Sequence, residues 1–494
     1  LQSFKVQNPN FSKDVLGYIM TTYYGGRSEV RIIKTPKKIS LIDFTSMYPT
    51  INILTQMDKF LVAESIDVID ATNEIQEFLN KVTINDAKKP EFWSKLHVIG
   101  LVKPDNYTIP SRMSFDKDEE AKNIGICQVT SDINLWITLA DLIAHKFQTG
   151  LTPKILKALK FSPKGIQKEL KFINVLGIDI DLRNENLFVK LVNERNRLKN
   201  SRELTSKEQA IKIVLNSISY GIYIEMNPEH EISDLQVYGL EKFKTKGKYE
   251  RDGAFFNPII ATTITGTSRL FLAIIEKLLS NLGMNHAFCD TDSMGVPPES
   301  VKKLQDFFRP LNPYNKDIEL LKEEYKDVLF YGISAKRYVL YELKDNQIQI
   351  LKHSLHGLGH LLNPFGKTED WHKGIWELIL NLHYGWISEN EFLSRYSNFY
   401  GIAKLSITSQ TMWNRIKNYN KGKTYSERIK PFGFIIVGFG MKFKNNKAIK
   451  PISPYQENSQ EVVHLPFIDV ESGNELQGIE YWKPLSEIIY GYIN

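Results

Sequence analysis

The stretch "SLIDFTSMYPTINIL", residues 40–54, decides the fold prediction. Its apolar start predicts a short buried strand over about 39–44 that ends on one acid, Asp43. A Thr-Ser pair follows, and Tyr48 stands five residues after the acid. A buried strand that ends on a carboxylate indicates a functional site, so other charged groups of the chain are candidates to join it.

The composition is that of a globular protein. The chain has 494 residues, 42% of them hydrophobic, 12% aromatic and 24% charged, so we expect about two to four domains. Its two cysteines, Cys127 and Cys289, form no CxxC pair. This pattern argues against a disulfide framework and a thiolate zinc site and favours a reducing compartment.

The sequence predicts no membrane association. Uncharged apolar runs such as residues 432–441 are too short to span a bilayer, and the N-terminus lacks the pattern of a signal peptide. We therefore expect a cytoplasmic or nuclear protein, associated with the nucleoid if its source is bacterial, archaeal or viral. The chain begins at Leu1 and not at Met, which suggests a fragment.

Positive charge is concentrated in one late segment. The net charge is +6, and residues 401–450 hold eleven Lys or Arg, Lys421 and Lys423 among them, against one acid, Glu427. Aromatic residues are interleaved with these bases. A solvated helix face would show the same run, but the lack of compensating acids favours a polyphosphate partner.

The overall pattern is mixed α and β. It predicts a strand at 39–44, mixed structure over 60–182, a helical pair over 183–221, a long helix over 259–282, a strand-turn-strand over 285–296, more strand over 329–351 and a mostly helical tail. Proline and glycine punctuation at 360–366 marks the clearest domain boundary.

A second acidic site lies in "HAFCDTDSMGV", residues 286–296. An apolar strand turns there and resumes, and strand alternation points Asp290 and Asp292 to the same side. Two carboxylates held this close repel each other unless a cation joins them, although a plain Asp-rich turn is the alternative. Asp43, with the backbone carbonyl of Phe44, would complete a clamp for two Mg²⁺ ions.

Two predicted helices offer polar side chains in pairs. Arg195 and Lys199 are four residues apart, as are Lys212 and Asn216, so each pair shares one helix face. Ion pairing with nearby glutamates would explain either helix alone. Two such helices facing each other would instead make a cradle for a triphosphate.

These segments resemble the motifs of family B DNA polymerases, in the order that the family has them. "DFTSMYPTI" (43–51) is similar to motif A, "KIVLNSISYG" (212–221) to motif B and "FCDTDSMGV" (288–296) to motif C. Three further segments resemble the family's Y-x-G-G, K-K-R-Y and late thumb segments: "TYYGG" (22–26), "AKRYVLYE" (335–342) and "RIKPFGFIIVG" (428–438). The resemblance covers nearly the whole chain except 60–182.

The resemblance implies a right-hand polymerase fold of the α/β (α+β) class, with an antiparallel-sheet palm, two-helix fingers and a mostly helical thumb. The implied domains are the N-terminal palm with motif A (1–60), a palm elaboration or insertion (61–182), the fingers (183–221), the palm with motif C (222–360) and the thumb (361–494). A charged hairpin insertion is expected near 226–256, as in protein-primed phage and mobile-element polymerases, with an unrelated surface elaboration as the alternative.

The resemblance also implies roles for single residues. Asp43 and Asp292 would hold two Mg²⁺ ions, for which Mn²⁺ can substitute, with the Phe44 carbonyl and with Asp290 as a less critical acid. The implied nucleotide contacts are the amides of Ser46 and Met47, the ring of Tyr48 as a gate against ribonucleotides, and Arg195, Lys199, Lys212, Asn216 and Tyr220. Lys212 is also the expected proton donor to pyrophosphate. The expected DNA contacts are Tyr23, Gly25, Gly26, Arg269, Lys336, Arg337 and Tyr338, to which the basic segment adds Lys421 and Lys423.

The sequence departs from the family pattern in several places. Motif B has one extra residue, which leaves open whether Ser219 or Tyr220 lies under the nascent base pair. The K-K-R-Y segment begins with Ala335, and Ser268 stands where the family has a glycine before Arg269. Only 42 residues precede Asp43, so we expect no proofreading exonuclease domain on this chain.

The expected function is a template-directed DNA polymerase that extends a primer 3′ end by two-metal-ion phosphoryl transfer. Its expected partners are primer–template DNA and dNTPs, with an exonuclease segment or a terminal or processivity protein as further partners. The alternative is a catalytically silent paralogue that serves as a DNA-binding or replisome scaffold. A reverse transcriptase would more often carry a Tyr-x-Asp-Asp turn. The retained acids and donors favour the active enzyme.

Overall fold

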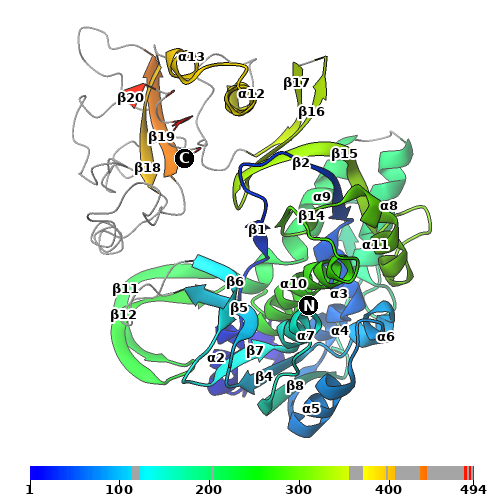
Figure 1. The fold of residues 1–494 in the computed structure, drawn as a ribbon. Coiled ribbons are helices and arrows are strands. Elements are labelled where there is room, and N and C mark those ends of the chain that lie inside the picture. Colours follow the sequence, from blue (N-terminus) through cyan, green and yellow to red (C-terminus); the bar gives the residue numbers. More distant parts are fainter. Residues whose placement is uncertain are drawn as a thin grey trace. The chain divides into compact units, whose positions relative to one another are not determined.

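The computed structural model describes residues 1–113, 123–201, 205–345, 347–354, 371–395, 399–405, 434–441, 483–484, 486, 489–490 and 493. The chain divides into two units, Leu1–Arg31 with Ile39–Asp327, and Ile32–Lys38 with Val328–Asn494 (Figure 1). The predicted boundary at 360–366, together with Lys421 and Lys423, lies outside the described residues. The finer division into five domains stays a prediction.

An antiparallel sheet lies in the first unit. Its strands have the order β1-β13-β14-β2, followed by the start of β15. Their bounds are β1 (Ser28–Val30), β13 (Phe288–Asp290), β14 (Ser293–Val296), β2 (Lys37–Phe44) and β15 (Leu321–Ser334). Residues 39–42 of β2 are all buried instead of alternating, so both faces of this strand are covered. The strands predicted at 39–44 and 285–296 are confirmed.

The long helix α10 (Pro258–Ser280) forms much of the core of this unit. Pro258 opens the helix, and the Asn257 side chain accepts a hydrogen bond from the Ile260 N–H (3.4 Å). Residues 258–275 are all buried. α10 is long and apolar enough to cross a membrane, but its apolar window lies entirely inside the structure, as in a core helix.

Residues 60–182 form the mixed α/β region that the sequence predicts. A four-stranded antiparallel sheet has the order β3 (Ser65–Asp70), β8 (Ile155–Lys164), β4 (Val98–Val102) and β7 (Leu135–Thr138). Helix α5 (Thr72–Lys81) packs on β8, and α7 (Leu139–Thr149) packs on β4 and along α10. The remaining elements here are α6 (Pro90–Trp93), β5 (Tyr107–Met113), β6 (Asn123–Val129), β9 (Ile173–Val175) and β10 (Ile178–Ile180).

The predicted helical pair is also confirmed. Helices α8 (Leu187–Ser201) and α9 (Thr205–Ile218) pack through a cluster that includes Phe188, Leu191, Ile211 and Leu215. The shorter helices of the first unit are α1 (Phe4–Gln7), α2 (Lys13–Thr21), α3 (Met47–Leu54), α4 (Met57–Val62) and α11 (Val301–Phe308).

A charged hairpin occupies the segment where an insertion is expected. Strands β11 (Met226–Val237) and β12 (Phe243–Asp252) pair in antiparallel register and form a curved ribbon (Figure 1). The tip of the ribbon touches α2, because the Lys242 ammonium pairs with Asp14 (2.6 Å). The ribbon is therefore held at its tip as well as at its base.

The second unit contains the end of β15 with β16 (Arg337–Lys344) and β17 (Gln347–His353). Helix α12 (Trp371–His383) packs on β17, and α13 (Glu389–Ser394) follows. A three-stranded sheet has the order β19 (Phe434–Met441), β18 (Phe399–Leu405) and β20 (Lys483–Pro484). The described part of the tail therefore contains the predicted helices and also a sheet that the sequence did not predict; the Phe, Ile and Val of residues 434–441 favour a strand.

Candidate active site

Two acidic segments meet in the central sheet. Asp43 pairs with Ser293 across β2 and β14, and Ser293 pairs with Asp290 across β14 and β13. Directly opposed residues share one face of a sheet, so Asp43 and Asp290 lie in one row across three strands. The Phe44 N–H donates to the Asp292 carbonyl (3.0 Å), which ties the turn to the end of β2. The structure thus brings the three predicted acids to one place.

The turn that carries Asp290 and Asp292 is tight. Thr291 has a φ of 64°, and the Asp292 N–H donates to the Asp290 carbonyl (2.8 Å). The Thr291 N–H donates to the Arg27 carbonyl (2.8 Å), so the segment before β1 holds the turn from outside. A β-branched residue at positive φ is an outlier, and strain of this kind is found at functional sites.

After Asp43 the chain enters α3 through a left-handed residue, Ser46, with a φ of 49° and a ψ of 55°. The Phe44 ring packs against Phe271 and Phe308, with ring centroids 5.0 and 4.9 Å apart, which fixes the end of β2. The first amides of a helix have no partner within it and favour an anion. The predicted phosphate contacts of Ser46 and Met47 are compatible with this position at the start of α3.

Tyr48 lies between the carboxylates and the end of α9. Its ring stacks on Tyr220, with centroids 5.1 Å apart and 30° between the planes. Burial raises the pKa of Tyr48, and nearby Tyr220, Asp292 and Asp290 raise it further. Ser219 is buried, whereas Tyr220 is half-buried. Of the two residues that motif B leaves open, Tyr220 is the one placed on Tyr48.

Asn52 is a buried residue of this region that the sequence did not single out. Its side-chain Nδ2 donates to the carbonyls of Tyr48 (2.8 Å) and Ser219 (3.0 Å). The asparagine thereby links α3 to the end of α9. Its position in the middle of an apolar helix gives no functional signal in the sequence.

Residues 22–26 reach the site through Gly26. A Cβ at this position would lie 3.1 Å from Thr291 Cγ2 and 3.5 Å from the Tyr48 hydroxyl. A Cβ at Gly25, by contrast, would meet no heavy atom within 4 Å. The Tyr23 hydroxyl hydrogen-bonds the Tyr220 hydroxyl. The predicted close approach of a phosphate thus fits Gly25, while Gly26 is constrained by the turn and by Tyr48.

The DNA contact predicted for Arg269 does not fit its burial. The side chains of Arg269 and Asp141 are 2% and 3% exposed, and the guanidinium pairs with both carboxylate oxygens of Asp141 (2.8 and 2.7 Å). It also donates to the carbonyls of Tyr24 (2.9 Å) and Gly25 (2.6 Å). Arg269 therefore holds residues 22–26 in place from the interior of the first unit, and its guanidinium is too buried to contact a phosphate.

The predicted cations of the helical pair lie on neighbouring faces. Arg195 Nε donates to Glu208 (2.7 Å), and this bond uses one of the five N–H donors of the guanidinium. Lys212 and Asn216 follow Glu208 at four-residue steps, so they continue the row of α9 that meets Arg195. Lys199, Lys212 and Asn216 are exposed. The ion-pairing alternative thus holds in part, for Arg195.

Lys322 is a cation near Asp43 that the sequence did not predict. Burial lowers the pKa of this half-buried lysine of β15, the charges of Lys199 and Arg195 lower it further, and Asp43 opposes them. The cations of α8 and the acid of β2 therefore both act on one ammonium. In the sequence, Lys322 stands in the charged run "LKEEYKD", which is typical of a solvated strand.

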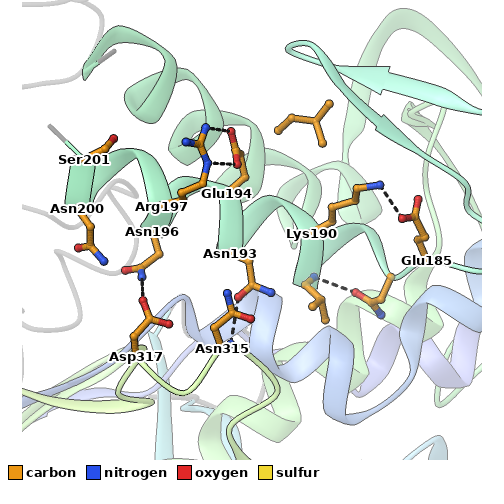
Figure 2. Close-up of a pocket in the computed structure, with 13 residues that line it drawn as sticks. Glu185, Lys190, Asn193, Glu194, Asn196, Arg197, Asn200, Ser201, Asn315 and Asp317 are labelled. Atoms are coloured by element: carbon orange, nitrogen blue, oxygen red, sulfur yellow. Dashed lines mark hydrogen bonds and ion pairs between the residues drawn. The ribbon is translucent and has the colours of Figure 1, made fainter. Parts of the chain in front are cut away.

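A different face of α8 lines a cavity of about 960 Å³ (Figure 2). Its amide side chains include Asn193, Asn196, Asn200 and Asn315. Asn196 donates to Asp317 (Nδ2–Oδ2, 2.8 Å). Its basic residues are paired with acids: Lys190 with Glu185 (2.6 Å) and Arg197 with Glu194 (2.8 Å). Because three acids, Glu185, Glu194 and Asp317, outnumber these two bases, this face offers less to a polyphosphate than the face with Lys199.

The predicted DNA contacts of the K-K-R-Y-like segment lie in the second unit. Lys336 occupies the turn between β15 and β16 with a φ of 60°, and its carbonyl accepts a hydrogen bond from the Ser354 hydroxyl. Arg337 and Tyr338 are buried, at 8% and 6% exposure. Lys336 is half-buried and is thus better placed to contact DNA than Arg337 or Tyr338.

No family model matches the chain, and no curated protein does. Among solved structures, the chain is similar to Phi29 DNA polymerase in an orthorhombic crystal form, with 15% identity, a TM-score of 0.40 and coverage of 72% of this chain and 58% of that one. A Phi29 DNA polymerase complexed with primer-template DNA and incoming nucleotides gives 14% identity, a TM-score of 0.41 and coverage of 82% and 61%.

A family B DNA polymerase from the hyperthermophilic archaeon Pyrobaculum calidifontis gives 14% identity and a TM-score of 0.29, with coverage of 82% of this chain and 40% of that one. The chain thus spans less than two thirds of the length of these neighbours. Similarity at this level describes a distant likeness in the path of the backbone.

Proposed function

We propose that this chain is a template-directed DNA polymerase of the family B type, which adds deoxynucleotides to a primer 3′ end. The observation that supports the proposal is the row formed by Asp43 and Asp290, with Asp292 tied to the end of the same strand and Tyr48 beside them. In this proposal the central sheet is the palm, and α8 and α9 are the fingers.

The acidic residues are suited to Mg²⁺. Asp43, Asp290 and Asp292 offer hard oxygen donors from adjoining strands and their turn, and all three are half-buried. The Phe44 carbonyl is the proposed fourth protein ligand. Two bound Mg²⁺ ions, or Mn²⁺ in their place, would activate the primer 3′-hydroxyl and stabilise the leaving pyrophosphate.

The groups around the carboxylates would hold the incoming dNTP. The amides of Ser46 and Met47 would meet phosphate oxygens, and Tyr48, backed by Tyr220, would fill the volume of a ribose 2′-hydroxyl. The proposed cations for the triphosphate are those of the helical pair, Arg195, Lys199 and Lys212, together with the amide of Asn216. Lys212 is the proposed proton donor to pyrophosphate.

The proposed DNA contacts are fewer than the sequence predicts. Tyr23 and Gly25 lie next to the site, and Lys336 belongs to the second unit. Lys421 and Lys423 remain proposed phosphate contacts on the strength of the basic segment alone. An exonuclease segment or a terminal or processivity protein is a proposed further partner.

Primer extension tests this function. The purified chain is given Mg²⁺, dNTPs and a template with a DNA, RNA or protein primer. We expect templated extension of at least one primer and no extension without Mg²⁺. Tight DNA binding with no extension under any of these conditions would contradict the enzyme and favour a scaffold role.

A further inference from the structure

Lys322 lies beside Asp43 on the neighbouring strand. The Thr45 N–H donates to the Leu320 carbonyl (2.8 Å), and the Asp327 N–H donates to the Ser40 side chain (3.3 Å). These two hydrogen bonds show that β2 and β15 are antiparallel. Asp43 and Lys322 both lie in the stretch between the two bonds. The sheet order, in which β2 and β15 are neighbours, agrees with this register.

The charges around Lys322 come from two directions. Asp43 acts on its ammonium from β2, while Arg195 and Lys199 act on it from one face of α8. The three cations repel one another, and although Glu208 and Asp43 offset part of their charge, an anion with several charges would offset the rest. A nucleoside triphosphate is such an anion, and its reacting phosphate would lie toward Asp43.

We infer that Lys322 binds the triphosphate of the incoming nucleotide, and the pyrophosphate that leaves it, together with Arg195 and Lys199. The inference rests on the proposed polymerase function. An ammonium on a strand is a compact charge that needs no helix movement to reach a phosphate. Lys322 would thus hold the polyphosphate from the sheet side, while α8 holds it from the helical side.

The chemistry of the step explains why a cation is useful there. A bond forms between the primer 3′-oxygen and the α-phosphorus, and the bond from the α-phosphorus to the bridging oxygen breaks. The electron pair stays on the departing pyrophosphate, and the proton of the 3′-hydroxyl passes to water. The negative charge that develops on the leaving group is the charge that Lys322 would stabilise.

The test compares Lys322→Met with Lys326→Met, a matched control on the exposed part of the same strand. Binding of a dNTP and of inorganic pyrophosphate is measured by calorimetry, and single-nucleotide incorporation is measured over a range of dNTP concentrations. We expect Lys322→Met to weaken both ligands about 10- to 100-fold. Lys326→Met should match the wild type, Lys322→Arg should recover most of the affinity, and DNA binding should not change.

Unchanged affinity for both ligands in Lys322→Met would overturn the inference, as would a loss confined to DNA binding. If Lys322→Met folds poorly, Lys322→Gln provides the same comparison. A wild type that binds dNTP through Lys322 but never extends a primer would contradict the polymerase and leave the binding role intact. The two failures are therefore distinguishable.

Discussion

Two groups of charged side chains in the first unit are organised in opposite ways. In the first, at the β1 edge of the sheet, Arg27 pairs with Glu29 (2.7 Å) and Glu276 (2.7 Å), Arg31 pairs with the same two acids, and His286 bonds Glu29 (2.8 Å). We call these five residues the Arg27 network. In the second, around Asp43, the acids are grouped on the strands, whereas the cations come from α8 and Lys322.

The pairing of acids with cations distinguishes a structural ion network from a ligand site. Burial alone would raise the pKa of Glu29, but the hydrogen bond to His286 and the charge of Arg27 hold it well below its usual range. Each acid of the network is thus paired with both arginines. Around Asp43, the three acids lie together on β2, β13 and the turn after β13, and the cations act from β15 and α8, as suits a ligand that carries both metal ions and phosphates.

A possible metal cluster within reach of the Arg27 network illustrates the rule. Ligand atoms of Glu29, His286 and Cys289 lie within 4.8 Å of one another. Burial raises the pKa of the Cys289 thiol to about 12, so it stays protonated, and Arg27 and Arg31 already neutralise Glu29. A metal ion bound there as a thiolate complex would disrupt the ion pairs that Glu29 makes with Arg27 and Arg31.

The largest expected effect is on catalysis by the acidic group. Asp43→Asn and Asp292→Asn should each lower the rate of nucleotide addition at least about a thousandfold, because each proposed ligand helps to hold ions that stabilise the transition state by several kcal/mol. Asp290→Asn should be milder. Rapid-quench incorporation measures the rates, and the melting temperature should stay within a few degrees. Near-normal rates in either variant would show that these acids are structural.

The next effect is on stability, in the Arg27 network. The Arg27 side chain is 3% exposed, so Arg27→Met should lower the free energy of unfolding by about 3 kcal/mol, because it leaves two half-buried acids with the more exposed Arg31 as their remaining arginine. Urea denaturation measures it. As a control, Lys81→Met breaks an exposed pair with Glu77 and should have a much smaller effect on the free energy of unfolding. Equal losses of unfolding free energy in the two variants would show that the Arg27 network contributes no more to stability than an exposed ion pair does.

Substitutions of Tyr48 test the proposed nucleotide site around Asp43. Tyr48→Val should raise the use of ribonucleotides about a hundredfold, since each 1.4 kcal/mol or so of relieved clash is worth tenfold in rate. Tyr48→Phe should change little. The ratio of kcat/KM for matched dNTP and rNTP is the measurement. An unchanged ratio in Tyr48→Val would make the ring a packing residue only.

The smallest effect is the pH dependence of the Arg27 network. Burial lowers the pKa of His286. As the pH decreases below about 6.5, the usual pKa of a histidine in an unfolded chain, the unfolded chain takes up the proton before the folded protein does, so the free energy of unfolding decreases. Glu276 continues this trend below about 4.5, because Arg27 and Arg31 outweigh its burial and lower its pKa. Denaturation between pH 7.5 and 5 should show the loss, and His286→Asn should make it shallower. A loss equally steep in His286→Asn would exclude this residue as its source.

The sequence predicted the elements whose pattern is local. The strand ends at Asp43 and at the Asp290–Asp292 turn and the helical pair follow from periodicity or turn residues within a short window, whereas the charged hairpin was expected from the resemblance. Their meeting in one sheet also followed, because the resemblance assigned both acidic segments to one palm.

Features that depend on distant partners were not predicted. Arg269 looked like a DNA contact because its buried partner, Asp141, lies 128 residues away in a region without motifs. Lys322 depends on the register of β15 against β2, and Asn52 depends on the end of α9. The sheet in the tail was missed because Phe434–Met441 was assigned to a thumb by resemblance, although its residues favour a strand.

Template-directed polymerisation is tested by single-nucleotide insertion on four templates that differ only in the next template base. Each is given one dNTP at a time with Mg²⁺, using the wild type, Asp292→Asn and Arg31→Met, a variant in the Arg27 network. We expect the wild type and any folded Arg31→Met to insert the complementary nucleotide, and Asp292→Asn to insert none at a comparable rate. Insertion that ignores the template base, or that persists in Asp292→Asn, would contradict a template-directed polymerase that depends on these acids.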